Sequence, residues 1–162
     1  MPKVAQHRNS GIIYNAWLGH RLLFTEEDTM ICPLPLFHVF ATIVCMGASL
    51  SSGAHIVFPT PQGYRGDGVF DNFWKLIERH KVTFMITVPT AMSALMQRPV
   101  NADTSTLRIA FCGSAPLPLE LYKKFEAAAG VTICEGYGLT EATCLVSINP
   151  PEGEKKVGSI GC

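Results

Sequence analysis

The sequence of 162 residues has no long apolar run and no excess of either charge. No uninterrupted apolar stretch approaches the roughly 20 residues that a membrane-spanning helix needs, and no charged lead followed by an apolar segment marks a signal peptide. Thirteen basic residues balance 13 acidic ones, which leaves no basic footprint for nucleic acid or an anionic membrane. These absences predict a cytoplasmic protein without a membrane span or nucleic-acid partner, whose partners are small molecules.

Motifs for several kinds of catalytic site are also missing. The six cysteines are scattered, mostly inside apolar runs. The sequence contains no Cys-x-x-Cys, the spacing that would suggest a disulfide framework or a metal-binding motif. The five histidines form no His-Glu-x-x-His, so no zinc site is assembled within one segment. Gly-x-Ser-x-Gly and Gly-x-Gly-x-x-Gly are absent, which disfavours a serine nucleophile elbow and an NAD-type site. Transient Mg²⁺ is the metal that the sequence leaves open.

What is present is an alternation of strand-like and helix-like segments. With 48% hydrophobic and 16% charged residues, the chain can bury one core and fits one domain. Short β-rich apolar runs predict buried strands at residues 29–32, 55–58, 83–88, 107–112 and 131–134. Helical spacing, with prolines and glycines as start and stop signals, predicts helices at residues 11–23, 41–50, 70–77, 89–99 and 118–130. The alternation predicts a single α/β subdomain over residues 1–162, an open layered and mostly parallel sheet with helices on both faces.

Three segments follow predicted strands, at the edge of the sheet where ligands collect. The first is Pro35-Leu36-Phe37-His38, just before a predicted helix. His38 is expected to line or gate an acyl pocket beside Phe37. The alternative is a histidine that only satisfies a buried hydrogen bond, and this segment taken alone favours that alternative.

The second segment is Gly113-Ser114-Ala115-Pro116, between a predicted strand and a predicted helix. Its small residues allow a flat ligand to lie against the backbone. Taken alone, the segment is an ordinary strand-to-helix turn. It indicates a ligand site only in combination with the third segment.

The third segment is Glu135-Gly136-Tyr137-Gly138-Leu139-Thr140-Glu141, which we expect to be a turn-sized stretch after the strand at 131–134. Tyr137 can offer a face to a purine, and Gly138 lets the backbone approach a ligand closely. Thr140 can donate to a phosphate oxygen, and Glu141 can hold a hard cation such as Mg²⁺. An ordinary strand-end turn is the alternative, but four chemistries packed together favour a nucleotide site.

Taken in order, four motifs resemble the signature series of the AMP-forming adenylating superfamily, which includes acyl-CoA synthetases, aryl-CoA ligases, luciferases and the adenylation domains of peptide synthetases. The motifs are Pro2-Lys3, Pro35-Leu36-Phe37-His38, Gly113-Ser114-Ala115-Pro116 and Tyr137-Gly138-Leu139-Thr140-Glu141. The resemblance spans essentially the whole chain. The Phe37-His38 pair and its apolar surroundings are most similar to the fatty-acyl and aryl CoA ligases.

The resemblance implies a role for each matching residue. The nucleotide and acyl region would be lined by Gly113, Ser114, Ala115, Pro116 and the strand-end residues Glu135, Gly136, Tyr137, Gly138 and Leu139. Tyr137 would pack against adenine, Thr140 would contact the AMP phosphate, and Glu141 would bind Mg²⁺. His38 would stand between the acyl pocket and the thiol tunnel. Lys3 would close a phosphate loop rich in glycine, serine and threonine.

The resemblance also implies parts that the 162 residues do not contain. The phosphate loop should precede Pro2-Lys3, and family members carry a ribose-binding aspartate, a hinge and a small C-terminal domain with a catalytic lysine beyond residue 162. We therefore expect the chain to be a central fragment of a larger adenylate-forming domain.

The implied reaction of the parent enzyme joins a carboxylic acid to coenzyme A at the expense of ATP, through an acyl-adenylate, with release of AMP and pyrophosphate. The small and apolar side chains of the expected pocket favour an apolar acyl or aryl acid, as in fatty acid metabolism. The 162 residues alone are expected to show no ligase turnover. The alternatives are a piece that only binds nucleotide and a structural core that self-associates as a homodimer through apolar surface.

Overall fold

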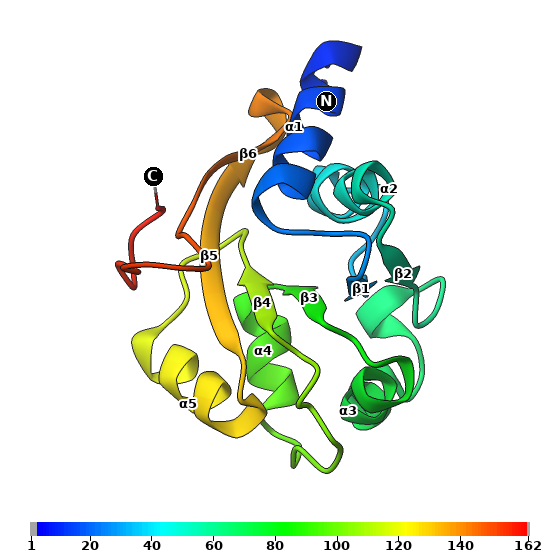
Figure 1. Ribbon diagram of the computed structural model, residues 1–162, viewed down its shortest axis with the longest axis vertical. Coiled ribbons are helices and arrows are strands. Elements are labelled where there is room, and N and C mark those ends of the chain that lie inside the picture. Colours follow the sequence, from blue (N-terminus) through cyan, green and yellow to red (C-terminus); the bar gives the residue numbers. More distant parts are fainter. Residues whose placement is uncertain (1–2, 162) are drawn as a thin grey trace.

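The protein is an open α/β structure built on one six-stranded sheet (Figure 1). The structure is a computed structural model that describes residues 3–161. Pro2 of the Pro2-Lys3 pair and Cys162 therefore lie outside the described residues. The strands lie in the spatial order β2 (His55–Val57), β1 (Thr29–Ile31), β3 (Phe84–Thr87), β4 (Ile109–Cys112), β5 (Thr132–Leu139) and β6 (Cys144–Ile148). The first five are parallel and β6 is antiparallel to β5, which confirms the predicted mostly parallel sheet.

Helices cover both faces of the sheet, as the alternation of strands and helices predicts. One face carries α1 (Asn9–Leu22), η1 (Phe40–Gly47) and α2 (Ala48–Ser52), and the other carries α3 (Val69–His80), α4 (Pro89–Leu95) and α5 (Leu119–Ala129). Two short turns, η2 (Gly63–Arg65) and η3 (Thr140–Ala142), complete the described elements. Pro118 precedes α5 and Gly130, at φ 64°, ends it, as the sequence predicts.

Successive side chains of the buried strands point into two different cores. In β3, Phe84 and Ile86 pack toward α1, η1 and α2, whereas Met85 packs toward α3, α4 and α5. The aromatic stripes of the sequence belong to the second core, where Phe73, Trp74 and Phe125 are almost fully buried. Because a strand buried on both faces needs apolar residues at every position, these strands read as continuous apolar runs.

Several elements differ from the sequence-based expectation. The strand β6 was not predicted, and the helix predicted at residues 89–99 ends at Leu95. The strand predicted to end at Cys134 continues through Leu139, because β6 supplies backbone partners to residues 136–139. The expected turn is therefore a strand end, and only Thr140–Ala142 turns. The helix predicted at 41–50 consists of eight residues with wide π-helical turns, Phe40–Gly47, followed by Ala48–Ser52. π-Helical turns are rare and are frequently found at functional sites.

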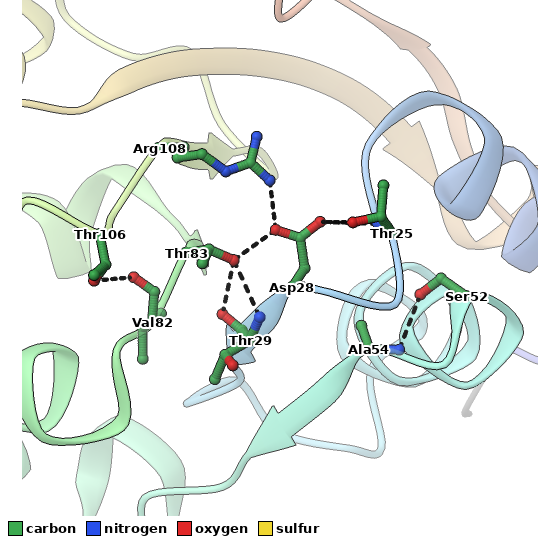
Figure 2. A network of polar contacts seen from close by, with 9 residues as sticks. All are labelled: Thr25, Asp28, Thr29, Ser52, Ala54, Val82, Thr83, Thr106 and Arg108. Carbon is green, nitrogen blue, oxygen red and sulfur yellow. Dashed lines mark hydrogen bonds and ion pairs between the residues drawn. The ribbon is translucent and has the colours of Figure 1, made fainter.

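A buried carboxylate ties together the amino ends of three strands (Figure 2). Asp28, 2% exposed, accepts hydrogen bonds from the Thr25 amide (2.8 Å), the Thr83 hydroxyl (2.6 Å) and the Arg108 guanidinium (2.5 Å). Thr83 Oγ1 also accepts the amide of Thr29, at 3.1 Å. This network lies just before β1, β3 and β4, at the edge opposite the carboxyl ends of the parallel strands.

The outward side of α1 is unusually apolar. Ile13, Tyr14 and Trp17 are 68%, 57% and 46% exposed, and the rings of Tyr14 and Trp17 stack with their centroids 5.9 Å apart. Within residues 3–161, no helix combines the length and the hydropathy that crossing a membrane requires.

Candidate nucleotide and acyl pocket

The second and third sequence segments meet the first at one pocket on the carboxyl edge of the sheet. The pocket has a volume of about 150 Å³. It lies between the ends of β4 and β5 and the start of η1. Its walls are formed by His38, Val39, Phe40, Val44, Phe111, Gly113, Ser114, Gly136, Tyr137, Gly138, Leu139, Thr140, Cys144 and Leu145.

Two glycines let this pocket exist beside two phenylalanine rings. A Cβ on Gly136 would lie 2.3 Å from the Phe111 ring, and a Cβ on Gly113 would lie 3.2 Å from Cζ of Phe40. The rings of Phe40 and Phe111 meet edge to face, with centroids 5.4 Å apart. The pocket therefore has an apolar floor of aromatic carbon below walls of bare backbone.

The thiol in this pocket is not poised for chemistry. Burial raises the pKa of Cys144 to about 12, so this side chain is a neutral thiol at physiological pH. Cys144 then acts as part of the apolar wall, together with Val44 and Leu145.

The turn after β4 forms one wall in a strained conformation. Ser114 has a positive φ of 71°, which a residue with a Cβ seldom adopts. Such strain persists only where surrounding contacts fix the backbone, and it concentrates at functional sites. Gly113 and Ser114 line the pocket, whereas Ala115 and Pro116 are exposed and continue the turn away from it.

The end of β5 forms the opposite wall. Tyr137, 42% exposed, and Leu139, 37% exposed, present their side chains near the mouth. Gly138 lies directly against β6, because a Cβ there would be 2.1 Å from the Cys144 carbonyl oxygen. Close strand pairing, rather than the freedom of a turn, is the reason for glycine at this position.

Thr140 and Glu141 follow on η3 at the mouth of the pocket. Thr140 lines it, and Glu141 is the next residue, exposed to solvent. The N-terminal segment reaches the same turn, since Nδ1 of His7 lies 3.4 Å from Oγ1 of Thr143. Lys3, also exposed, precedes His7 by four residues. Figure 1 shows the orange turn between β5 and β6 beside α1.

His38 also lines the pocket, just before η1. Its side chain is exposed, which contradicts the alternative of a buried histidine. Its Nδ1 accepts a hydrogen bond from the Phe40 amide at 3.2 Å, which orients the ring at the beginning of the helix. The neighbouring residues Leu36 and Phe37 line a second, wider hollow of about 1050 Å³ that opens over the ends of β1, β2 and β3.

Glu135 is a predicted site residue whose side chain is buried and bonded outside the pocket. It is 9% exposed and does not line the pocket. Its carboxylate accepts the backbone amides of Leu117 (3.3 Å) and Gly158 (3.0 Å).

Several pocket residues were not singled out from the sequence. Val39, Phe40 and Val44 are not among them, because they fall in the stretch from His38 to Val44 that the sequence indicates as acyl-pocket lining. Phe111, Cys144 and Leu145 carried no such signal, because strand residues of a two-sided sheet look equally apolar whichever face they occupy.

The fold and pocket are those of a ligand-binding α/β domain. In such domains the site lies at the carboxyl ends of parallel strands, where turns of small residues between a strand and the next helix allow close approach of a ligand. The family model described as AMP-binding enzyme matches residues 1–162. The chain belongs to this AMP-binding enzyme family.

The curated relatives are CoA ligases. The chain is 39% identical over 167 residues to marinolic acid–CoA ligase of Pseudoalteromonas sp. (strain SANK 73390), covering 99% of this chain and 26% of that protein. It is 35% identical over 133 residues to a long-chain-fatty-acid–CoA ligase of Bacillus subtilis (strain 168), covering 80% of this chain and 22% of the relative. The chain thus spans about a quarter of the length of these relatives.

Solved structures show the same fold. The anthranilate CoA ligase in complex with anthranoyl-AMP superposes with a TM-score of 0.82 at 28% identity, over 97% of this chain and 30% of that chain. The O-succinylbenzoate coenzyme A synthetase of Bacillus subtilis, in complex with ATP and a magnesium ion, superposes with a TM-score of 0.80 at 26% identity, over 97% of this chain and 32% of that one.

Proposed function

We propose that this chain is the pocket-forming part of an AMP-forming acid–thiol ligase. The enzyme would convert a carboxylic acid, ATP and coenzyme A into acyl-CoA, AMP and pyrophosphate through an acyl-adenylate. The observation that carries the proposal is one pocket lined by His38, by Gly113 and Ser114, and by the strand end from Gly136 to Thr140. The AMP-binding family match and the CoA ligase relatives support the same reaction.

In the first half-reaction, a carboxylate oxygen attacks the α-phosphorus of ATP and the bond to the bridging oxygen of pyrophosphate breaks. The residues of this chain bind and orient the reactants. The ring of Tyr137 offers a face to adenine, and the Thr140 hydroxyl can donate to a phosphate oxygen. Holding both reactants in one pocket removes about 7 kcal/mol or more from the barrier, because their translational and rotational entropy is already lost on binding, before the chemical step.

Glu141 is the residue of this site that fits Mg²⁺. It offers a hard carboxylate oxygen at the pocket mouth, beside the phosphate-contacting Thr140, and Mg²⁺ is commonly held by one or two carboxylates and by substrate phosphates. Bound there, the ion would neutralise negative charge on the phosphates.

We assign the thiol of coenzyme A as the acceptor in the second half-reaction. The thiolate sulfur would attack the acyl carbon, and AMP would leave with the electron pair of the broken C–O bond. His38 is suited to this step by its position, because it lines the pocket while its neighbours Leu36 and Phe37 line the wider hollow. The acceptor in the named relatives is coenzyme A as well.

The acid is proposed to be apolar. Phe40, Phe111, Val44 and Leu145 leave no charged group on the floor of the pocket. A buried apolar floor favours an acyl or aryl group over a second carboxylate or an ammonium group, whose burial without a partner is costly.

Acid-dependent pyrophosphate release tests the reaction. The assay uses a chimera in which this chain replaces the matching segment of the marinolic acid–CoA ligase, supplied with ATP, Mg²⁺ and a panel of fatty and aromatic acids. Release is expected with apolar acids, and Glu141→Gln is expected to lower the rate by about 100-fold or more, since it removes a charge that serves the transition state. The control is Glu154→Gln, an exposed glutamate outside the pocket. A folded chimera that fails to release pyrophosphate with every acid of the panel would contradict the assignment. A Glu141→Gln variant with the normal rate would contradict it as well.

Phe111→Leu is expected to change acid preference. The smaller side chain deepens the pocket floor, so kcat/KM for acids bulkier than the preferred one should rise by about tenfold relative to it. The matched control is Phe125→Leu, which removes the same atoms from a residue buried in the other core. That variant should lose similar stability and keep the original ranking of acids. An identical shift of preference in both variants would show that general loosening, rather than the floor, is responsible.

A further inference from the structure

The carboxylate of Glu135 lies between two segments that are far apart in the sequence. Oε1 accepts the amide of Leu117, at the end of the turn that carries Ser114, and Oε2 accepts the amide of Gly158. The backbone carbonyl of Glu135 accepts a third amide, that of Asn149, at 2.8 Å. One residue at the middle of β5 thus joins the pocket wall to the segment at residues 156–161.

Asn149 is the second anchor of that segment. Its side chain is buried, 4% exposed, and makes two hydrogen bonds to it. Nδ2 donates to the Ser159 carbonyl at 3.0 Å, and Oδ1 accepts the Lys156 amide at 3.1 Å. Glu135 and Asn149 together therefore hold residues 156–159 at three backbone groups.

We propose that Glu135 and Asn149 are positioning residues that dock the 156–161 segment against β5 and thereby fix the turn at residues 113–117 in its ligand-binding shape. Neither side chain lines the pocket, so both act through the turn. The consequence for ligand affinity rests on the proposed function.

The strained backbone of Ser114 explains why such an anchor is needed. A residue with φ of 71° relaxes unless both sides of its turn are held. On one side, the Gly113 amide donates to the Thr87 carbonyl at 3.3 Å. On the other side, the Leu117 amide donates to Glu135. A carboxylate is the suitable partner, because its two oxygens accept both amides at once and hydrogen bonds to a charged acceptor are strong.

The role of Gly158 follows from the same geometry. The Gly158 amide donates to Oε2 of Glu135. This hydrogen bond orients the carboxylate so that Oε1 faces the Leu117 amide. Releasing the 156–161 segment frees the carboxylate to rotate toward solvent. Loss of the Asn149 side chain, which bonds Lys156 and Ser159, is therefore expected to loosen the Leu117 amide.

Amide hydrogen exchange measured by NMR on the full chain tests this coupling. In Asn149→Ala, exchange at the Leu117 and Gly158 amides should rise at least tenfold. The Ile133 amide of β5, which donates to the Glu126 carboxylate of α5 at 2.9 Å, should stay protected. Glu135→Gln should act likewise, because its side chain has one carbonyl oxygen for two donors. Glu152→Gln, an exposed change near the same segment, is the control. If Asn149→Ala fails to fold, Asn149→Asp keeps the acceptor for Lys156 and removes the donor to Ser159.

Faster exchange at Gly158 with unchanged exchange at Leu117 would overturn the coupling. An equal rise at Ile133 would also overturn it, because the effect would then be global destabilisation.

A second arm measures affinity for a non-hydrolysable acyl-adenylate on the same proteins. Glu135→Gln and Asn149→Ala should each weaken binding at least tenfold, and the double variant should be no weaker than the worse single one, since both act on one turn. Equal affinity in wild type and variants would overturn the positioning role. Absence of binding by the wild type would contradict the proposed function and leave the exchange result to decide the coupling of the two segments.

Discussion

Asp28→Ala is expected to lower the free energy of unfolding by about 2–4 kcal/mol, because it removes the buried carboxylate that accepts charge-assisted hydrogen bonds from the Thr25 amide and the Thr83 hydroxyl. The loss of the Arg108 ion pair adds little to this figure, since the guanidinium is half exposed and turns to solvent. Urea unfolding followed by circular dichroism measures the change. The loss should appear as a lower midpoint with an unchanged slope.

A second Asp–Arg pair in the same chain provides the matched control. Asp71 and Arg98 form an ion pair with an N–O distance of 2.6 Å, but the Asp71 side chain is 69% exposed. Asp71→Ala is therefore expected to cost less than about 1 kcal/mol. Equal losses for the two alanine variants would show that burial of Asp28 does not matter.

The contribution of Asp28 is also expected to depend on pH. Burial by itself would raise the pKa of Asp28, but hydrogen bonds from Thr83 and Thr25 and the charge of Arg108 outweigh it and hold the pKa below its ordinary value. A carboxyl with a lowered pKa in the folded state stabilises fully above its unfolded pKa, near 4, and this stability is lost as the pH falls through the folded pKa. The difference between wild type and Asp28→Ala should therefore be constant near neutral pH and shrink in acid below about pH 4.

Gly138→Ala is expected to abolish binding of an acyl-adenylate, with an affinity loss of about 100-fold or more. The added Cβ would lie 2.1 Å from the Cys144 carbonyl oxygen and 2.8 Å from its carbonyl carbon, and backbone atoms cannot move aside as a flexible side chain does. The end of β5 must separate from β6, which displaces Tyr137 and Thr140 from the pocket walls. Titration calorimetry with a non-hydrolysable acyl-adenylate reports the loss.

The control for this change is Gly130→Ala at the end of α5. Gly130 has a φ of 64° and nothing within 4 Å of an added Cβ. This alanine is expected to cost about 1 kcal/mol of stability through backbone strain and to leave adenylate affinity unchanged. Unchanged affinity in Gly138→Ala, in a protein shown to be folded, would contradict the place given to the strand end in the site.

The arrangement of the sheet could be predicted because its signals are local. Continuous apolar runs such as 84–87 and 109–112 are typical of strands buried on both faces, and Pro118 and Gly130 mark the ends of a helix wherever the rest of the chain lies. The residue types of the candidate site were equally visible, since the adjacent Tyr137, Gly138, Thr140 and Glu141 combine several nucleotide-binding chemistries within five positions.

Long-range pairing decided what the sequence could not indicate. A mostly parallel α/β fold and the motifs that follow its strands could be read from the residues, because periodicity and turn chemistry act over a few positions. The folded chain shows in addition that β5 extends to Leu139, that Phe111 forms the pocket floor, and that the Glu135 carboxylate faces Leu117 and Gly158. Each of these features depends on a partner at least 18 residues away or on another element, and the residue types alone do not specify which partner a backbone or carboxylate group meets.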